Sequence, residues 1–364
     1  MESGDGWLAR VRTPGGVIGS DQLRAVADAS ILAGSGLVDI TSRANLQLRG
    51  CRGDELDELA VRLTAAGLSS GDAVTDQAKA VVDSPFAEPG RWERFSDAIR
   101  AGVSMAAGVG GLPAKFSVVI NLDPDWPMHD LDADAVVGPD GVVLRRSAGR
   151  VATDGSLDTA RQVVASIASW CARTGERSDL LPADVAERSA LDVRAADPVR
   201  AVEHVGVHDS PPPIVLGVAR RETAFVTAPL LGRCDGAALR RVADLADEHR
   251  ALIRLTNQRS VAFLSGDDKA MGFGALGHQL AALGWLTERN APVANVSACV
   301  GSAGCSAGRI DTSRFAHVVA STHGGGRVHI SACEKGCGAP RTVPHLIADQ
   351  LGNVSHEASK GVAS

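Results

Sequence analysis

The chain has 364 residues and a formal net charge of −6 at pH 7, and 45% of its residues are hydrophobic. A chain of this composition buries a sizeable core in two or three domains, which excludes intrinsic disorder. Its mildly acidic charge disfavours non-specific binding to nucleic acid, and no stretch approaches the about 18 apolar residues of a membrane span. Because the first residues lack both the basic and the apolar part of a targeting segment, we expect a cytoplasmic protein with no membrane partner.

The first 70 residues predict the order strand, helix, strand, helix. Residues Trp7–Val11 read as a strand, and the helix that follows has Asp21 as its expected N-cap. The stretch LVDITSRANLQLRG alternates between apolar and polar residues, which predicts extended structure. A second helix is expected to begin at Asp54 and to end at Gly67.

The same order of elements returns after a proline linker at residues 211–213. LRRVADLADEH repeats the earlier LRAVADAS, and LIRLTNQRSVAFLS repeats LVDITSRANLQLRG. Arg43 and Arg259 fall at matching places within a slip of one residue. Two such copies predict a pseudo-two-fold pair of ferredoxin-like halves, with chance similarity between amphipathic helices as the alternative.

A different kind of segment follows each copy. After the first copy we expect strands at Ser117–Leu122 and Val142–Leu144 and a helix at 157–173; after the second, strands near Ala316–Ala320 and Arg327–Ile330. The predicted organisation is therefore a first half at 1–70, a core domain at 71–200, a second half at 201–288 and a second core domain at 289–364.

Two cysteine pairs lie in glycine-rich stretches of the last segment, Cys299 with Cys305 and Cys333 with Cys337. Four thiolates on two such loops suit an iron–sulfur cluster, because each cluster iron takes a soft thiolate ligand. Structural zinc is one alternative, although five residues separate the first pair, which is wider than the usual zinc knuckle. Unrelated burial is the other. The remaining three cysteines fall on apolar or element-terminal positions, and we expect them to be inert.

Several of these stretches together resemble the nitrite/sulfite reductase superfamily of sirohaem and iron–sulfur proteins. They are the RVRTPGGVI start, the TSRANLQLRG strand, the LPAKF turn, the second half-repeat and both cysteine pairs, which span nearly the whole chain. The resemblance implies an α+β fold: two pseudo-two-fold-related ferredoxin-like halves plus two mixed α/β core domains of sirohaem-reductase type. It also implies a [4Fe–4S] cluster on the four cysteines, with Cys337 bridging to the sirohaem iron in the reductases.

The resemblance further implies a tetrapyrrole in the same site. In the reductases, basic side chains at the positions of Arg43, Lys79 and Lys115 contact its carboxylates or a small anionic substrate. Along one face of the extended stretch, Arg49 alternates with polar residues whose charge-assisted hydrogen bonds suit such carboxylates. The candidates for tetrapyrrole or substrate binding are Arg43, Asn45, Gln47, Lys79 and Lys115. The alternative for each is an ordinary solvated position.

Within this superfamily, the sequence is closer to the precorrin-3B synthases. It has Lys335 in the second cysteine pair where the reductases commonly carry asparagine, and Ser117 where they carry a second lysine after the LPAKF-like turn. Loss of that cation disfavours reduction of sulfite or nitrite, since positive charge holds and helps to protonate the oxyanion. The resemblance then implies a monooxygenase of cobalamin biosynthesis, which hydroxylates precorrin-3A at C20 with dioxygen and closes a lactone to give precorrin-3B.

Dioxygen chemistry requires single electrons, which an unidentified donor must supply. The resemblance implies a separate mononuclear non-haem iron for this step, because four thiolates saturate the cluster. No 2-His-1-carboxylate pattern locates that iron; His323 and His329 are candidates, with an ordinary surface or core histidine as the alternative. Two other functions stay open: a sirohaem-dependent nitrite or sulfite reductase, and a non-catalytic iron–sulfur or tetrapyrrole-binding protein.

Overall fold

The computed structural model describes residues 2–106, 111–126, 128, 133–139, 141–144, 150–152, 156–178, 214–219, 222–266, 272–324, 326–339, 343–349 and 354–357. The chain forms two compact units. The first comprises Met1–Val11, Ile18–Leu68 and Asp209–Ser364, and the second comprises Arg12–Val17 and Ser69–His208. No helix within the described ranges is both long enough and apolar enough to cross a membrane. The predicted proline linker lies outside the described residues.

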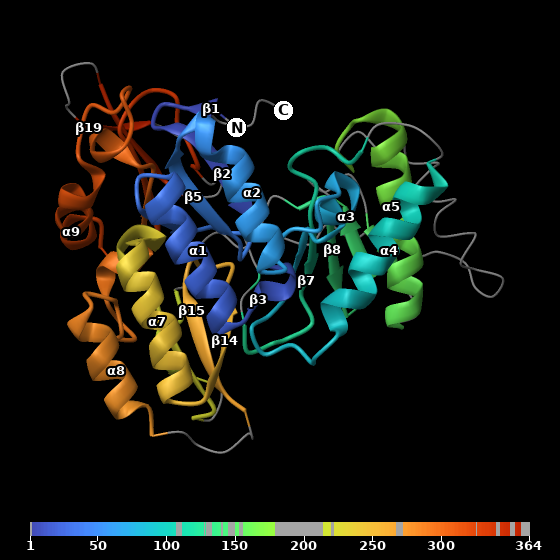
Figure 1. Cartoon of the computed structure of the whole chain (residues 1–364), viewed down its shortest axis with the longest axis horizontal. Helices are drawn as coiled ribbons and strands as arrows, with labels where there is room; N and C mark the ends of the chain where they lie inside the picture. The colour runs from blue at the N-terminus through green and yellow to red at the C-terminus, as the bar shows by residue number, and fades with distance from the viewer. Residues whose placement is uncertain are drawn as a thin grey trace. The chain divides into compact units, whose positions relative to one another are not determined.

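The first half-repeat is a five-stranded sheet with two helices on one face (Figure 1). Its strands are ordered β1 (Glu2–Ser3), β2 (Gly6–Val11), β5 (Leu46–Cys51), β4 (Leu37–Ile40) and β13 (Arg233–Asp235). Its helices are α1 (Ser20–Ala33) and, after a short 3-10 turn at Gly53–Glu55, α2 (Leu56–Ala65). The N-cap of α1 is Gly19 rather than Asp21, which lies in the first turn. The expected single extended stretch is in fact two strands, β4 and β5, joined by a turn.

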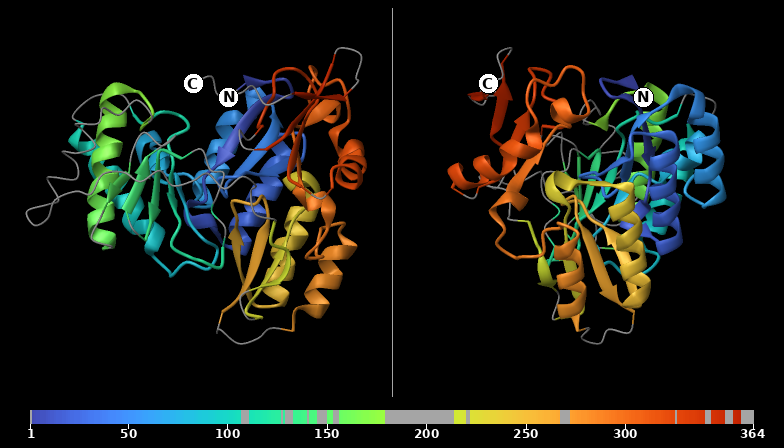
Figure 2. Two further views of the ribbon diagram at one scale, coloured as in Figure 1. Left: turned by 180° about the vertical axis from the view of Figure 1, so that it is seen from behind. Right: turned by 60° about the vertical axis from the view of Figure 1, so that its left-hand side comes forward.

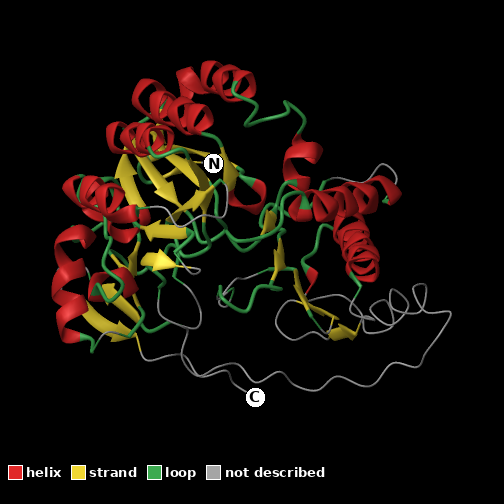
Figure 3. Cartoon of the chain, turned by 90° about the horizontal axis from the view of Figure 1, so that it is seen from below, coloured by secondary structure: helices red, strands yellow, loops and turns green. Residues whose placement is uncertain are grey.

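The second half-repeat has the same construction. Its strands are ordered β11 (Gly217–Ala219), β12 (Ala224–Thr227), β15 (Val261–Ser265), β14 (Ala251–Leu255) and β3 (Val17–Ile18). Its helices are α7 (Gly236–Glu248), capped by the side chain of Asp235, and α8 (Phe273–Ala282). As Figures 2 and 3 show, helices line one side of the strands here as in the first half. Each half contributes one edge strand to the other sheet, since β13 pairs with β4 and β3 neighbours β14.

Backbone conformations repeat along with the elements. Gly15 and Leu231 have φ of 61° and 60° in the turn before the edge strand. A side chain at such a φ is unfavourable, so Leu231 keeps this geometry only because the fold requires it. Ala44 and Arg259 have φ of 52° and 58° in the turns before β5 and β15. The counterpart of Arg259 is therefore Ala44, one residue beyond Arg43, and the predicted pair of ferredoxin-like halves is confirmed.

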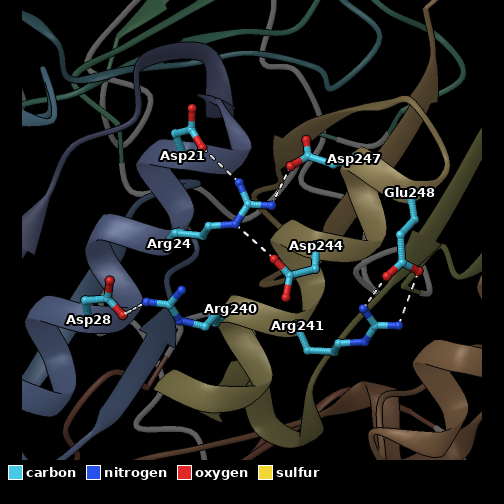
Figure 4. A network of polar contacts seen from close by, with 8 residues as sticks. All are labelled: Asp21, Arg24, Asp28, Arg240, Arg241, Asp244, Asp247 and Glu248. Atoms are coloured by element: carbon cyan, nitrogen blue, oxygen red, sulfur yellow. Dashed lines mark hydrogen bonds and ion pairs between the residues drawn. The ribbon is translucent and has the colours of Figure 1, made fainter.

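The two halves dock through α1 and α7, whose polar contacts Figure 4 shows. Arg24 Nε of α1 lies 2.9 Å from Asp244 Oδ1 of α7, and Arg240 of α7 pairs with Asp28 of α1. In the two copies of the repeat, Arg24 is equivalent to Arg240 and Asp28 is equivalent to Asp244. Exchanging the two helices therefore turns one ion pair into the other. The helix interface therefore has the self-complementary contacts of a two-fold axis within one chain.

The second unit is built on a sheet ordered β10 (Arg150–Ala152), β9 (Gly141–Leu144), β8 (Ala135–Gly138), β7 (Val118–Ile120) and β6 (Val81–Val82). Its helices are α3 (Ala73–Ala78), α4 (Arg91–Met105) and α5 (Leu157–Thr174). Strands β6, β7 and β8 are parallel, and α4 supplies the crossover between the first two. Phe95 and Ile99 of α4 pack with Ile167 of α5 in its core, which confirms the helix predicted at 157–173.

The last segment of the first unit repeats this topology on a smaller scale. Its strands are β16 (Val296–Ala298), β17 (Val328–Ser331), β18 (His345–Ala348) and β19 (Val354–Glu357), and the first three are parallel. Helix α9 (Thr312–Thr322) connects β16 to β17. The predicted strand near Ala316–Ala320 is wrong, because these residues lie in α9, whereas the strand predicted at Arg327–Ile330 is β17 within one residue.

Candidate functional site

Both cysteine-bearing loops leave the same edge of the small sheet. Strands β16 and β17 are adjacent and parallel, with Ala298 opposite Ile330. Cys299 directly follows β16, and Cys333 comes two residues after β17. Because parallel strands end at a common edge, their loops meet there although some thirty residues separate them in the sequence. This placement explains why two cysteine pairs that are distant along the chain can serve one site.

The four thiols are close enough to affect one another. Burial raises the pKa of Cys337, the thiols of Cys299, Cys333 and Cys305 raise it further, and the Lys335 ammonium acts in the opposite direction. Cys337 is exposed, whereas the other three are half-buried. The remaining cysteines are buried away from this group, and none of the seven forms a disulfide. A set of four neighbouring free thiols fits a metal centre that bonds thiolates.

The backbone of the two loops is shaped around the cysteines. The Ala332 amide donates a hydrogen bond to Cys299 Sγ at 3.2 Å, which stabilises a thiolate there. Gly301 has φ of 68°, and a Cβ atom on Gly308 would lie 2.5 Å from the backbone of Gly301 and Ser302. Only glycine permits that close approach, so the Cys299–Cys305 loop folds back tightly on itself.

An iron–sulfur cluster and a zinc ion differ in how far apart their thiolates lie. Zinc needs four sulfurs around a single centre. A cluster binds each thiolate to a different iron, so its cysteines lie farther apart while still being neighbours. Within the part of the chain that is described, no group of three or more His, Cys, Asp or Glu side chains converges closely enough to hold one metal ion.

His329, one of the two histidines that the sequence offered as iron ligands, uses both ring nitrogens within the protein. His329 is 0% exposed, and both its ring nitrogens are engaged, Nδ1 with Ser297 Oγ at 2.9 Å and Nε2 with the Cys337 carbonyl at 3.2 Å. Burial, with the nearby Arg259 charge, lowers the pKa of His329 to about 3. His323 caps the C-terminus of α9. His329 is therefore a buried structural histidine.

In the first unit, the candidate tetrapyrrole-binding residues lie on and just before β5. Arg43 is half-buried in the turn between β4 and β5, where its amide donates to Thr41 Oγ1. Asn45 is 7% exposed at the end of this turn, and Gln47 is half-buried on β5, opposite Arg10 of β2. Of the three residues, only Gln47 therefore lies on the strand, and Arg43 and Asn45 belong to the turn before it.

Arg49 does not belong with these candidates. Its guanidinium is bound by two carboxylates, Asp5 at 2.7 Å and Asp39 at 2.7 Å, and Asp39 also pairs with Arg233 at 2.6 Å. All four side chains are largely buried. The expectation that Arg49 either binds a ligand carboxylate or is solvated is therefore wrong, since the protein's own carboxylates neutralise it.

In the second unit, Lys79 and Lys115 lie at the N-terminal ends of the parallel strands. Lys79 caps α3 and pairs with Asp76 at 2.8 Å, and Lys115 is exposed in the turn before β7. Ser117 is 1% exposed, and its hydroxyl has no hydrogen-bond partner within the described ranges; the same holds for Gln77 Oε1. Buried polar atoms without partners are costly, so a polar ligand group fits there.

Gln77 is a residue that sequence reasoning missed. A Cβ atom on Gly111 would lie 2.6 Å from Gln77 Oε1, so the side chain of Gln77 packs against the start of the turn that carries Lys115. The helical position of Gln77 in the sequence gives no sign of this, because the contact joins two segments far apart along the chain. Only the orphaned amide oxygen in the folded structure points to it.

The second unit has no thiols at the positions equivalent to the cluster loops. After β6 and β7 stand Asp83 and Asp123, where the last segment has cysteines after β16 and β17. Asp83 is 0% exposed and accepts from Arg91 Nε at 2.9 Å, while Asp123 accepts from Ser84 at 2.9 Å. These carboxylates are satisfied by neighbouring side chains, so one of the two related sheets provides a thiol site.

The fold and the cysteine site can be compared with known proteins. Residues 1–66 match the family described as Nitrite/Sulfite reductase ferredoxin-like half domain. The solved structure of Mycobacterium tuberculosis NirA protein aligns with 96% of this chain and 73% of its own, with a TM-score of 0.64 and 20% sequence identity. The chain therefore has the nitrite/sulfite reductase fold that the sequence predicted.

Particular relatives extend this resemblance. Ferredoxin–nitrite reductase of Synechococcus elongatus is 34% identical over 134 residues, which are 34% of this chain and 26% of that protein. Precorrin-3B synthase of Sinorhizobium sp is 26% identical over 94% of this chain and 77% of its own length. Sulfite reductase (ferredoxin) 2 of Mycolicibacterium paratuberculosis is 24% identical over 82% of this chain and 60% of its own. The match thus spans less than two thirds of both reductases, and the chain resembles the superfamily and its precorrin-3B synthases, as predicted.

Proposed function

We propose that this protein is an oxygen-dependent monooxygenase that converts precorrin-3A to precorrin-3B by C20 hydroxylation and lactone formation. The observation that carries this proposal is the extent of the likeness to precorrin-3B synthase, which covers 94% of this chain and 77% of that protein. The likeness to sulfite reductase covers only 60% of the reductase. The alignment with the synthase therefore includes more of both proteins than the alignment with this sulfite reductase.

The residues of the second unit favour the same choice. Ser117 replaces a reductase lysine, and its buried hydroxyl carries no charge. A small oxyanion would find one cation fewer at this place, which weakens both its binding and its protonation. A macrocycle with several carboxylates spreads its charge over separate contacts, so Arg43, Lys79 and Lys115 suit it without Ser117.

The cysteines Cys299, Cys305, Cys333 and Cys337 would hold a [4Fe–4S] cluster, which supplies single electrons when it is bound. One oxygen atom of dioxygen would enter the product, and the other would leave as water after taking up two electrons from a donor and two protons from solvent. The chain's own contribution is to hold and orient the macrocycle's carboxylates through its basic and amide side chains. A mononuclear iron remains part of this proposal, with ligands other than His329.

Conversion of precorrin-3A tests the proposal. The anaerobically purified protein, given precorrin-3A, a chemical reductant and ¹⁸O-labelled dioxygen, should yield a lactone that carries one labelled oxygen at C20. Lys115→Gln should raise KM with a smaller effect on kcat, because it removes a carboxylate contact, while Arg62→Gln on the exposed side of α2 serves as the cation-removal control. Turnover of sulfite or nitrite without any oxygenated product would refute the proposal.

A sirohaem-dependent nitrite or sulfite reductase is the second candidate. The 34% identity to a nitrite reductase over the aligned 134 residues supports it. Under this reading Cys337, the exposed thiol, would bridge the cluster and the sirohaem iron. Reduction of nitrite or sulfite by the reduced protein, abolished by Cys337→Ser, is the expected result for a reductase.

A further inference from the structure

Two imidazoles from neighbouring strands lie beside the loop that carries Cys337. His329 of β17 and His345 of β18 are directly opposite in the parallel register. Their ring centroids are 5.3 Å apart, with 59° between the ring planes. His329 is fully buried, and His345 is half-buried. Two histidines in such contact beside a metal-binding loop are unusual for a purely apolar core, and neither has a role in the function proposed above.

The hydrogen bonds of His329 define one tautomer. The Cys337 carbonyl can only accept, so His329 Nε2 carries the hydrogen of the 3.2 Å contact. In the neutral ring Nδ1 then accepts, and the Ser297 hydroxyl donates to it at 2.9 Å. The result is a directed chain that runs from Ser297 through the imidazole to the backbone of Cys337.

The cysteine loop is also shaped to rest on the two rings. Gly336 and Gly338 flank Cys337 and have φ of 63° and 77°. A Cβ atom on Gly336 would lie 3.2 Å from His345 Cε1, and one on Gly338 would lie 4.0 Å from His329 Cε1. Glycine is needed for the left-handed backbone, and at Gly336 it also leaves the room that the imidazole takes. His345 is itself fixed, with Nε2 at 2.6 Å from Ser331 Oγ.

We propose that His329 is a positioning residue for the metal centre: its Nε2–H, with Nδ1 held by Ser297, fixes the Cys337 loop and withdraws electron density from this ligand through its carbonyl. The proposal rests on the proposed function only in assuming that Cys337 binds a cluster. Hydrogen bonds around the ligands are among the determinants of a cluster's reduction potential. Cys337 is the exposed member of the four, so its loop gains most from an anchor inside the protein.

The test is the midpoint potential of the reconstituted full-length protein, followed by electron paramagnetic resonance of the reduced cluster. His329→Leu removes the donor and should shift the potential to a more negative value. His329→Gln can still donate from Nε2, so its midpoint potential should stay close to that of the wild type. Ser297→Ala should shift the potential in the same direction as His329→Leu, but by less. His317→Leu, on the exposed face of α9, is the matched control and should leave the potential unchanged.

Two outcomes would overturn the proposal. A leucine variant with the wild-type potential and spectrum would show that the hydrogen bond does not reach the cluster. A glutamine variant shifted as far as leucine would reduce His329 to a packing residue.

The wild-type protein gives a second, independent readout if the leucine variant does not fold. ¹⁵N-labelled histidine in the metal-free protein should show His329 as the Nε2–H tautomer, and an Nδ1–H tautomer would contradict the directed chain. Neither readout uses precorrin-3A. Suppose that the protein does not oxygenate this substrate, but that the potential shifts in His329→Leu and the wild type has the Nε2–H tautomer. The proposed function would then be refuted, and the role of His329 would stand.

Discussion

Gly4 lies where the first strand pair meets the loop of Cys305. The Ser306 amide donates to the Gly4 carbonyl at 3.0 Å, and a Cβ atom on Gly4 would overlap Cys305 Sγ. Gly4→Ala must therefore displace either the strand or the thiol. We predict less iron and sulfide bound per chain after anaerobic reconstitution, with little change in the melting temperature.

Gly53→Ala is the control for this substitution. A Cβ atom there makes only ordinary contact with Trp7, at 3.5 Å or more, so iron binding should be unchanged. If Gly4→Ala and Gly53→Ala bind equal amounts of iron, the first strand pair moves to make room for the added Cβ atom without displacing the thiol of Cys305. That result would contradict the prediction that iron binding needs glycine at position 4.

Asp39 is the residue on which the buried charges of the first sheet depend. Burial alone would raise its pKa, but Arg233 and Arg49 outweigh burial and hold the pKa below its ordinary value. Because the folded-state pKa is the lower one, this stabilisation is present above about pH 4 and is lost as pH falls through the folded-state value. We predict that the unfolding free energy of the wild type falls in this acid range, and that Asp39→Asn removes part of the fall.

At neutral pH the same substitution should destabilise the protein by about 3 kcal/mol, because it leaves buried arginines without their shared partner. Asp97→Asn removes an exposed ion pair with Arg100 on α4 and should cost about 1 kcal/mol or less. Denaturant unfolding at several pH values measures both. Equal costs for the two variants would show that Asp39 is not the organising charge.

At the scale of elements, the close approach of α4 and α5 depends on Gly102. A Cβ atom there would overlap the Ala165 carbonyl oxygen. Gly102→Ala should destabilise the second unit by about 1–3 kcal/mol through overpacking, although alanine favours a helix. Gly274→Ala in α8 faces open space and should stabilise slightly instead. Chemical denaturation measures the free energy of unfolding of both variants. If Gly102→Ala and Gly274→Ala change it in the same direction, the close packing of α4 on α5 at Gly102 would be contradicted.

At the α1–α7 interface, the two equivalent arginines have different numbers of carboxylate partners. Arg24 contacts Asp244, Asp247 and Asp21, whereas its equivalent, Arg240, contacts Asp28. Hydrogen bonds to Asp247 and then Asp244 raise the pKa of Arg24. Arg24→Ala should therefore cost more than Arg240→Ala, and the difference should shrink in 1 M salt. Equal costs at low salt, measured by thermal unfolding, would count against a network centred on Arg24.

Some elements could be predicted from the sequence and others could not. The repeated helices were found because their apolar spacing is regular and their order returns along the chain. The segment around Val318 and Val319 is predicted wrongly, because a short apolar run with β-branched residues suits a strand or a helix equally. In the structure Asp311 caps this segment, and buried Thr312 and Ala316 lie on the inner face of the helix. An aspartate that precedes residues at helical spacing is the feature of the sequence that indicates a helix here.

Across the whole chain, the sequence indicates the candidate site residues better than it indicates the contacts between them. The four cysteines were recognisable from their spacing, and parallel strands bring their loops together. The partners of Arg49 cannot be recognised from the sequence. Asp5 and Asp39 approach Arg49 only because β2, β5 and β4 pair in one sheet. The buried histidines could not be told from surface ones for the same reason. Contacts between distant segments are set by topology, which no local pattern records.

The absorption spectrum of the anaerobically purified protein tests whether four thiolates bind a cluster that serves a tetrapyrrole substrate. We expect the broad absorption of an iron–sulfur cluster, which bleaches on reduction. This absorption should disappear in Cys299→Ser, Cys305→Ser, Cys333→Ser and Cys337→Ser and survive in Cys171→Ser. We expect no intense bands of an iron tetrapyrrole. A Soret band with the visible bands of sirohaem, or a cluster lost in Cys171→Ser and kept in Cys337→Ser, would contradict it.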